Sequence, residues 1–243
     1  ENSKIMGMLK QMLRQLLGNR IVTCLHAKKT KWAMSLYGEK AVAEFDAIIR
    51  NQNSLYWLAF GTLLGAYREK GFIKNDDDID VGMFCDDITP EVIEKLEKKG
   101  FIYEHAILTA DSLYCQISFK YHGISFDIYG FRKNSDKSNS ITGFVPRALH
   151  DKNWKESFDL NQFKILLVNM DCDGFIDYPH FKSLTVIIPR STEVFLKKHY
   201  GDDFMTPIPG KKGNSRKTVT EIPIEKMTAS IVDKKQLFER LKK

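Results

Sequence analysis

The run from Asp76 to Asp80 constrains this chain more than any other feature, because four of its five residues are aspartates within an apolar stretch. A β-strand points alternate side chains to opposite faces. An extended run would therefore place Asp76, Asp78 and Asp80 on one face. Ile79 and Val81 would lie on the other face, against a core. Carboxylates this close repel one another unless a cation lies between them. Because hard divalent cations take oxygen ligands, we expect Mg²⁺ or Mn²⁺ here.

Two other interpretations of the acidic run agree less well with the sequence. A charge run is most often a solvated turn, but apolar residues bracket and interleave these aspartates. An EF-hand loop needs a glycine at its sixth position and a glutamate at its twelfth. Counted from Asp76, those positions hold Val81 and Asp87. The pattern therefore favours a carboxylate metal site built on a strand.

The segment before the aspartates is typical of a phosphate-binding turn. Residues 55–60 form an apolar run of strand length, Gly61 and Thr62 follow, and residues 63–70 suit a short helix that contains Arg68. A glycine lets the backbone approach an anion, and a helix N-terminus offers free N–H groups. A phosphate site beside a metal site is what phosphoryl or nucleotidyl transfer requires.

Together these residues resemble the LicD/fukutin-like phosphotransferases, a family of the nucleotidyltransferase-fold superfamily. The resemblance rests on Phe60-Gly61-Thr62-Leu63-Leu64-Gly65-Ala66, Arg68, Gly71-Phe72-Ile73 and Asp76-Asp77-Asp78-Ile79-Asp80-Val81-Gly82-Met83. It implies an α+β fold with a nucleotidyltransferase-like mixed β-sheet core flanked by helices.

The resemblance also implies a metal site and a role for each carboxylate. Asp78 and Asp80 would be catalytic residues that hold the metal. Asp127, in the alternating segment Ile124-Ser125-Phe126-Asp127-Ile128-Tyr129, would complete the site or accept the proton of the acceptor hydroxyl. Asp76 would bind a second ion. The strand that carries Asp127 is therefore expected beside the strand of the other aspartates.

For the donor, the resemblance implies that the Gly61 and Thr62 amides and Arg68 bind phosphate oxygens. The implied reaction transfers a phosphoalcohol, phosphocholine being the first choice, from a CDP-linked donor to a hydroxyl of a cell-surface glycan and releases CMP. Lipopolysaccharide, teichoic acid, capsule and lipid-linked glycans are acceptors of this kind. Transfer of ribitol- or glycerol-phosphate is one alternative, and a nucleotidyltransferase that releases pyrophosphate from an NTP is another. A non-catalytic binding module is disfavoured, since uncompensated buried acids would destabilise it.

Helical periodicity suggests how the rest of the chain is organised. Residues 1–54 are expected to form helices that pack on the core, and residues 55–209 the catalytic domain. Residues 210–243 would be a basic segment of the same unit. Its stretch from Gly210 to Lys217 is interpreted as solvated, with binding of a phosphate-bearing substrate or a membrane as the alternative.

Local turn and cap signals predict several element ends. Thr89-Pro90 is a typical helix start, and His122-Gly123 predicts a tight hairpin between two strands. Ser191 is expected to cap a helix that ends at Gly201.

The net charge of +6 and the pI of about 9.0 favour anionic partners such as nucleotides, phosphorylated glycans or a membrane surface, without indicating nucleic acid. Residues 4–25 have apolar residues at helical spacing with basic residues between them. This amphipathic segment would pack on the domain or make a peripheral contact with anionic lipid.

The cysteines suggest a reducing compartment. Cys24, Cys85, Cys115 and Cys172 are scattered and form neither a C-x-x-C nor a zinc pattern. Neither a stretch of membrane-spanning length nor a signal-peptide pattern is recognised. We therefore expect a cytoplasmic location that includes the inner membrane face, or the Golgi lumen for a eukaryotic source.

Overall fold

The computed structural model describes residues 29–74, 76–109, 114–135, 139–149, 153–207, 219–221 and 228–242. The amphipathic segment predicted at residues 4–25 and the basic stretch from Gly210 to Lys217 lie outside these ranges. Within them, none of the helices combines the length and the apolar character needed to cross a membrane.

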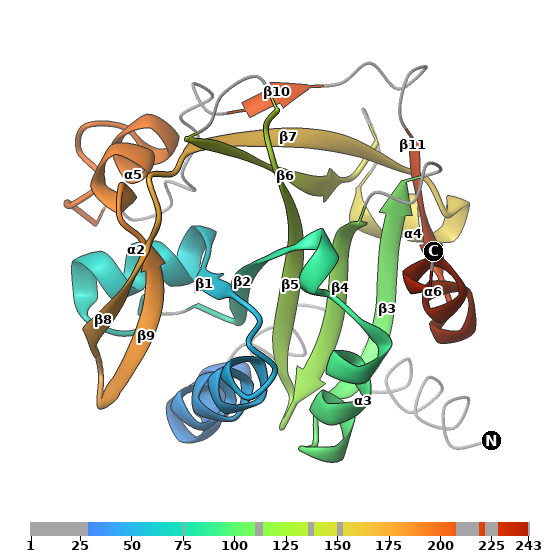
Figure 1. The fold of residues 1–243 in the computed structure, drawn as a ribbon, viewed down its shortest axis with the longest axis horizontal. Helices are drawn as coiled ribbons and strands as arrows, with labels where there is room; N and C mark the ends of the chain where they lie inside the picture. The colour runs from blue at the N-terminus through green and yellow to red at the C-terminus, as the bar shows by residue number, and fades with distance from the viewer. Residues whose placement is uncertain are drawn as a thin grey trace, which may run out of the picture.

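A large mixed sheet forms the centre of the molecule (Figure 1). Its strand order is β1-β2-β5-β4-β3-β11-β7-β10, and β6 pairs with both β5 and β7. β2 and β5 are parallel, and the other pairs are antiparallel. The strands are β1 (Tyr56–Leu58), β2 (Asp78–Phe84), β3 (Ile102–Thr109), β4 (Tyr114–Tyr121), β5 (Ile124–Lys133), β6 (Ser140–Arg147), β7 (Phe163–Asp171), β10 (Val219–Glu221) and β11 (Thr228–Val232).

Helices and one small hairpin surround this sheet (Figure 1). The hairpin is a separate two-stranded sheet. With the helical residues 29–50, the fold is α+β, as predicted. The elements are α2 (Phe60–Glu69), the 3₁₀ turn η1 (Cys85–Asp87), α3 (Pro90–Lys98), α4 (Trp154–Leu160), α5 (Thr192–Tyr200), α6 (Lys234–Leu241), β8 (Phe175–Phe181) and β9 (Leu184–Pro189).

Alternation along β2 and β5 gives the sheet one apolar and one polar face. Ile79, Phe126 and Ile128 are fully buried. Phe45 of the helical residues 29–50 packs on Phe126, with ring centroids 4.8 Å apart. The residues between them in sequence, including Asp80 and Asp127, point to the opposite face. The hydrophobic core on one face thus holds the strands whose other face carries the aspartates.

Most of the predicted element ends are confirmed. Thr89 caps α3, its hydroxyl accepting from the Val92 amide at 3.3 Å. His122 and Gly123 turn between β4 and β5 with φ values of 48° and 90°, the left-handed conformation that a two-residue hairpin needs. α5 ends before Gly201, as expected, but Ser191 forms no cap.

Two local predictions were wrong. The run 55–60 is not a strand throughout, because β1 ends at Leu58 and α2 already begins at Phe60. β2 begins at Asp78, so Asp76 precedes the strand instead of sharing its pleat.

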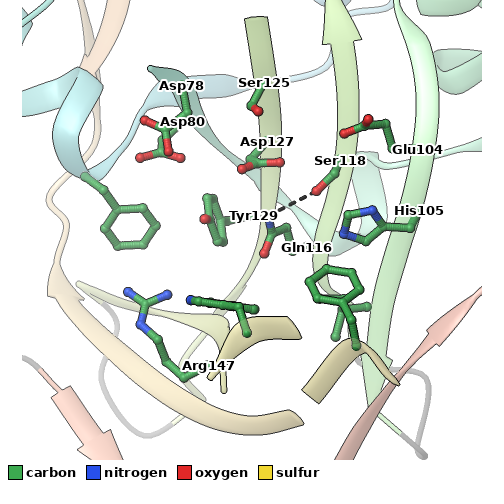
Figure 2. A pocket seen from close by; sticks show the side chains of 14 residues that line it. Asp78, Asp80, Glu104, His105, Gln116, Ser118, Ser125, Asp127, Tyr129 and Arg147 are labelled. Carbon is green, nitrogen blue, oxygen red and sulfur yellow. Dashed lines mark hydrogen bonds between the residues drawn. The ribbon is translucent and has the colours of Figure 1, made fainter. Parts of the chain in front are cut away.

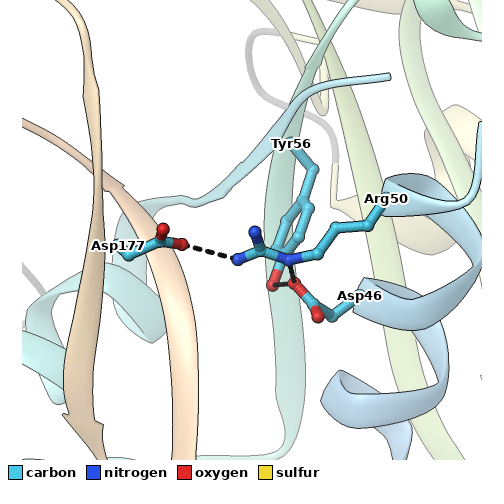
Figure 3. Close-up of polar contacts among 4 residues, drawn as sticks. All are labelled: Asp46, Arg50, Tyr56 and Asp177. Carbon is cyan, nitrogen blue, oxygen red and sulfur yellow. Dashed lines mark hydrogen bonds and ion pairs between the residues drawn. The ribbon is translucent and has the colours of Figure 1, made fainter. Parts of the chain in front are cut away.

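One polar cluster joins the helical residues 29–50 to the sheet and the β8–β9 hairpin (Figure 3). Arg50 donates from Nε to Asp46 Oδ1 at 2.8 Å and from Nη2 to Asp177 Oδ1 at 2.7 Å. The buried Tyr56 hydroxyl donates to the same oxygen of Asp46 at 2.8 Å. The two carboxylates thus share one guanidinium, and the hydrogen bonds that Arg50 donates to Asp177 and Asp46 hold its pKa above its usual value.

Candidate active site

The parallel pairing of β2 with β5 brings three predicted carboxylates together. Asp80 lies opposite Asp127 in the register, and Asp78 lies opposite Ser125. Ligand oxygens of Asp78, Asp80 and Asp127 all lie within 4.8 Å of one another. They line one side of a cavity of about 630 Å³ (Figure 2). An octahedral Mg²⁺ places opposite ligands about 4 Å apart, twice its metal–oxygen distance. Small movements of the side chains would therefore let one ion bind oxygens of all three carboxylates.

Burial makes the ionised form of these carboxylates unfavourable. Asp80 is 8% exposed and Asp127 9%. Burial, with the charges of Asp78 and Asp127, raises the pKa of Asp80 well above its ordinary range. Burial followed by the charge of Asp77 raises the pKa of Asp78 to about 6. Burial also raises the pKa of Asp127, against hydrogen bonds from Ser118 and Gln116.

The carboxylate chemistry fits a divalent cation. Asp80 Oδ1 is buried without a hydrogen-bond partner among the described residues, and the same is true of Asp76 Oδ2. A buried carboxylate oxygen with no donor is costly to leave unsatisfied. Asp76, although outside the strand, forms a second cluster with Asp77 and Asp78. Burial and the charge of Asp78 raise the pKa of Asp76 to about 7. A hard cation is the simplest occupant that would satisfy these oxygens.

The first turn of α2 lies beside the carboxylates. A Cβ added to Gly61 would come within 3.6 Å of Asp76 Oδ2 and 3.9 Å of Asp80 Oδ2. No side chain caps this turn, so its first amides keep hydrogen-bonding capacity for an anion. Thr62 is fully buried, and its hydroxyl accepts from the Asp80 amide at 2.9 Å. Gly61 therefore borders the site, whereas the Thr62 side chain positions Asp80.

The structure places Arg68 away from the predicted phosphate site. It lies at the opposite end of α2 and does not line the cavity. Its guanidinium bonds to Glu69, at 2.6 Å from Nη2, and to the Phe204 carbonyl at 3.1 Å. These contacts give Arg68 a local role in holding the chain after α5.

The cation that does reach the cavity is Arg147, the last residue of β6, which no motif had indicated. It is the one arginine or lysine among the described residues that line the cavity, and Figure 2 shows its guanidinium directed inward. Its Nη1 donates to the Pro146 carbonyl at 3.0 Å. Arg147 forms no ion pair with the carboxylates of the described residues. Its charge nevertheless acts on Asp80, opposing the rise of the Asp80 pKa.

The cavity extends from the carboxylates across β4 and β3 to α4. Gln116 of β4 donates to Ser118 at 3.1 Å, and both face the cavity beside Asp127 (Figure 2). His105 of β3 lies further along, and burial lowers its pKa. Trp154 of α4 helps to close this end. The site therefore has a charged end and an aromatic end.

The comparisons with known proteins agree with the geometry. A family model described as LicD/FKTN/FKRP, nucleotidyltransferase domain, matches residues 53–171. The matched residues run from just before β1 to the end of β7. They contain Asp76, Asp78, Asp80 and Asp127 as well as Arg147.

Three relatives illustrate the similarity. An uncharacterized protein of Caenorhabditis elegans is 28% identical over 169 residues, which cover 64% of this chain and 43% of that protein. A mouse protein named ribitol-5-phosphate transferase FKTN is 27% identical over 155 residues, 63% of this chain and 30% of that protein. An uncharacterized protein of Rickettsia prowazekii is 35% identical over 80 residues, 31% of this chain and 29% of that protein. This chain spans less than half the length of each of these relatives.

Proposed function

Because the chain belongs to the LicD/fukutin-like family, we propose that it transfers a phosphoalcohol from a CDP-linked donor to a glycan hydroxyl and releases CMP. The observation that carries the proposal is the group formed by Asp78, Asp80 and Asp127. Their ligand oxygens lie within 4.8 Å of one another, and Asp80 Oδ1 lacks a donor among the described residues. Such a group suits a phosphotransferase that works with Mg²⁺ or Mn²⁺.

Ribitol phosphate is the transferred group that we favour, ahead of phosphocholine and glycerol phosphate. The support is the name of the mouse relative, ribitol-5-phosphate transferase, at 27% identity. A human protein with the same name is 26% identical over 156 residues. The acceptor would be a cell-surface or lipid-linked glycan.

Different residues of the chain would bind the metal and the phosphate oxygens of the donor. Held by Asp78, Asp80 and Asp127, a divalent cation would supply positive charge to the donor diphosphate and to the departing CMP. Arg147 would bind a phosphate oxygen from the other side of the cavity with a charge-assisted hydrogen bond. The first amides of α2, around Gly61, would orient a further anionic oxygen.

The transfer step forms one bond and breaks one. The acceptor hydroxyl oxygen attacks the phosphorus that carries the alcohol, and the bond from this phosphorus to the CMP oxygen breaks. CMP leaves with the electron pair of that bond. The hydroxyl proton passes to a carboxylate oxygen of Asp127, which lies opposite Asp80 in the pairing of β2 with β5.

Product analysis tests this proposal directly. The protein is incubated with Mg²⁺, a glycan acceptor mixture and either CDP-ribitol, CDP-choline, CDP-glycerol or CTP, and CMP and pyrophosphate are separated by chromatography. We expect CMP from one CDP-alcohol, and about 10²–10³-fold less or lower still with Asp78→Asn. Pyrophosphate from CTP without CMP from any CDP-alcohol would identify an NTP-dependent nucleotidyltransferase and overturn the proposal.

A further inference from the structure

The aromatic end of the cavity is not accounted for by the metal and diphosphate chemistry. Trp154 and Phe158, both on α4, line it although they are 43% and 39% exposed. Large apolar side chains left open inside a polar cavity commonly mark a ligand surface. The exposed part of each ring is therefore open to a ligand in the cavity.

α4 is held firmly although it buries little of its own surface. A capping box joins Asn153 and Glu156 at its start. The buried Ser157 hydroxyl accepts from the Leu149 amide at 3.0 Å, and Asn161 after its end donates to the Ile231 carbonyl at 3.3 Å. The helix is thus anchored through polar contacts. Its aromatic residues are left available for another role.

The two aromatic rings are also fixed in place. Both pack on the fully buried Phe163 of β7, with centroids 5.9 Å from Trp154 and 5.3 Å from Phe158. His105 meets Phe158 edge-on at 5.2 Å. A rigid aromatic surface binds a flat ligand face with little loss of conformational entropy.

The polar groups at this end suit neutral hydroxyls. Gln116 offers its carbonyl oxygen as an acceptor, since its amide donates to Ser118 and to Asp127, and neutral His105 offers a donor and an acceptor. Glu104 is balanced by Lys120, whose Nζ lies 3.7 Å away and which does not line the cavity. The cation of the cavity, Arg147, lies across from the carboxylates, and its charge acts on Asp80. A phosphate therefore fits the charged end better than this one.

We propose that Trp154 and Phe158, with Gln116 and His105, form the subsite for a sugar ring of the acceptor. A sugar ring has an apolar C–H face for the aromatic rings and hydroxyls at its edge for the polar side chains. Gln116 is followed along β4 by Ser118, which borders Asp127, so a sugar here would direct a hydroxyl to the carboxylates. The inference rests on the proposed function, because it takes the transferred group to be bound at the charged end.

Glycan binding by single-site variants tests the subsite. Labelled full-length protein is applied to a microarray of defined oligosaccharides with Mg²⁺ and CDP present, and the best-bound oligosaccharide is then titrated by calorimetry. We expect Trp154→Ala and Phe158→Ala to weaken its binding at least about tenfold. CDP is titrated separately, and its affinity should fall much less. The matched control is Leu160→Ala, an apolar residue of the same helix that is 53% exposed and does not line the cavity.

Two results would overturn the subsite. One is a larger loss of CDP affinity than of oligosaccharide affinity in Trp154→Ala and Phe158→Ala, which would make α4 a nucleobase platform. The other is oligosaccharide binding that is absent in the wild type or unchanged in both variants. CMP release from CDP-alcohols is measured in parallel. Failure of the proposed reaction would thus be seen separately from failure of the subsite.

Discussion

Two clusters of aspartates lie on opposite sides of this fold, and they differ in how their charge is balanced. Asp46 and Asp177 share the Arg50 guanidinium at 2.8 and 2.7 Å. Asp78, Asp80 and Asp127 are close to one another, yet no cation of the described residues pairs with them, and Arg147 stays across the cavity. The first cluster is complete within the chain. The second needs a ligand.

This difference separates a structural role from a catalytic one. A carboxylate paired with arginine near the surface contributes little free energy but fixes geometry. Buried carboxylates held together without a partner cost free energy. A bound cation and substrate would offset the cost of such an arrangement, and we therefore propose that the unbalanced cluster is the functional one. Substitutions in and around the two clusters test the contrast.

The largest effect is expected in the unbalanced cluster. Asp78→Asn and Asp80→Asn should each lower turnover by about 10²–10³-fold or more, because each removes a metal ligand. Without metal, the melting temperature should stay level or rise, since each change relieves repulsion. CMP release and differential scanning calorimetry give the two readings. Unfolding of both variants would instead assign these aspartates a structural role.

The next effect concerns the cation of the cavity. Arg147→Gln should lower kcat/KM for the CDP-alcohol by about 10–100-fold, the loss expected for a charge-assisted hydrogen bond. The affinity for Mg²⁺ alone should not fall. Arg132→Gln is the control, because Arg132 is exposed on β5 and does not line the cavity. Equal losses in the two variants would mean that only overall charge matters.

A substitution in the balanced cluster should change the free energy of unfolding and leave kcat unchanged. Asp46→Ala removes the acceptor of the buried Tyr56 hydroxyl and should lower the free energy of unfolding by about 1–3 kcal/mol. Asp46→Asn keeps an acceptor and should cost less. Urea unfolding measures the difference. A loss of kcat in the folded variant would contradict the division between the two clusters.

A smaller, pH-dependent effect is expected at His199 of α5. Burial and then the charge of Arg147 lower the pKa of His199 to about 4 from an ordinary 6.5. Between these values the unfolded chain binds more protons, so stability falls as the pH drops from 6.5 to 4. His199→Asn should reduce this loss by roughly 1–2 kcal/mol. Unfolding curves at pH 7 and pH 4.5 measure it, and an unchanged pH dependence would contradict the assignment.

Local patterns predicted the parts of the site that lie on one strand. The alternation at Asp78 and Asp80 predicted their shared face, and the alternation around Asp127 placed it on the polar face of its own strand. Asp76 does not share this face as the alternation predicted, because β2 begins only at Asp78. Arg68 and Arg147 could not be distinguished from the sequence. Their positions depend on the length of α2 and on the pairing of β6 with β7.

The aromatic end was still less predictable, although one signal was present. Asn153 and Glu156 have the spacing of a capping box, which indicates the start of α4. No periodicity in so short a helix shows that Trp154 faces a cavity and not the core. That placement comes from β3 and β4, which lie far away in sequence.

The parallel pairing of β2 with β5 also affects how the molecule folds. A two-residue turn joins β4 to β5, whereas η1, α3, β3 and β4 lie between β2 and β5 in the sequence. Pairings between segments distant in sequence form slowly. This late pairing also brings Asp80 and Asp127 together, so mutual repulsion opposes it. Divalent cations should therefore accelerate the last step of refolding, and the same ion would serve first in assembly and then in catalysis.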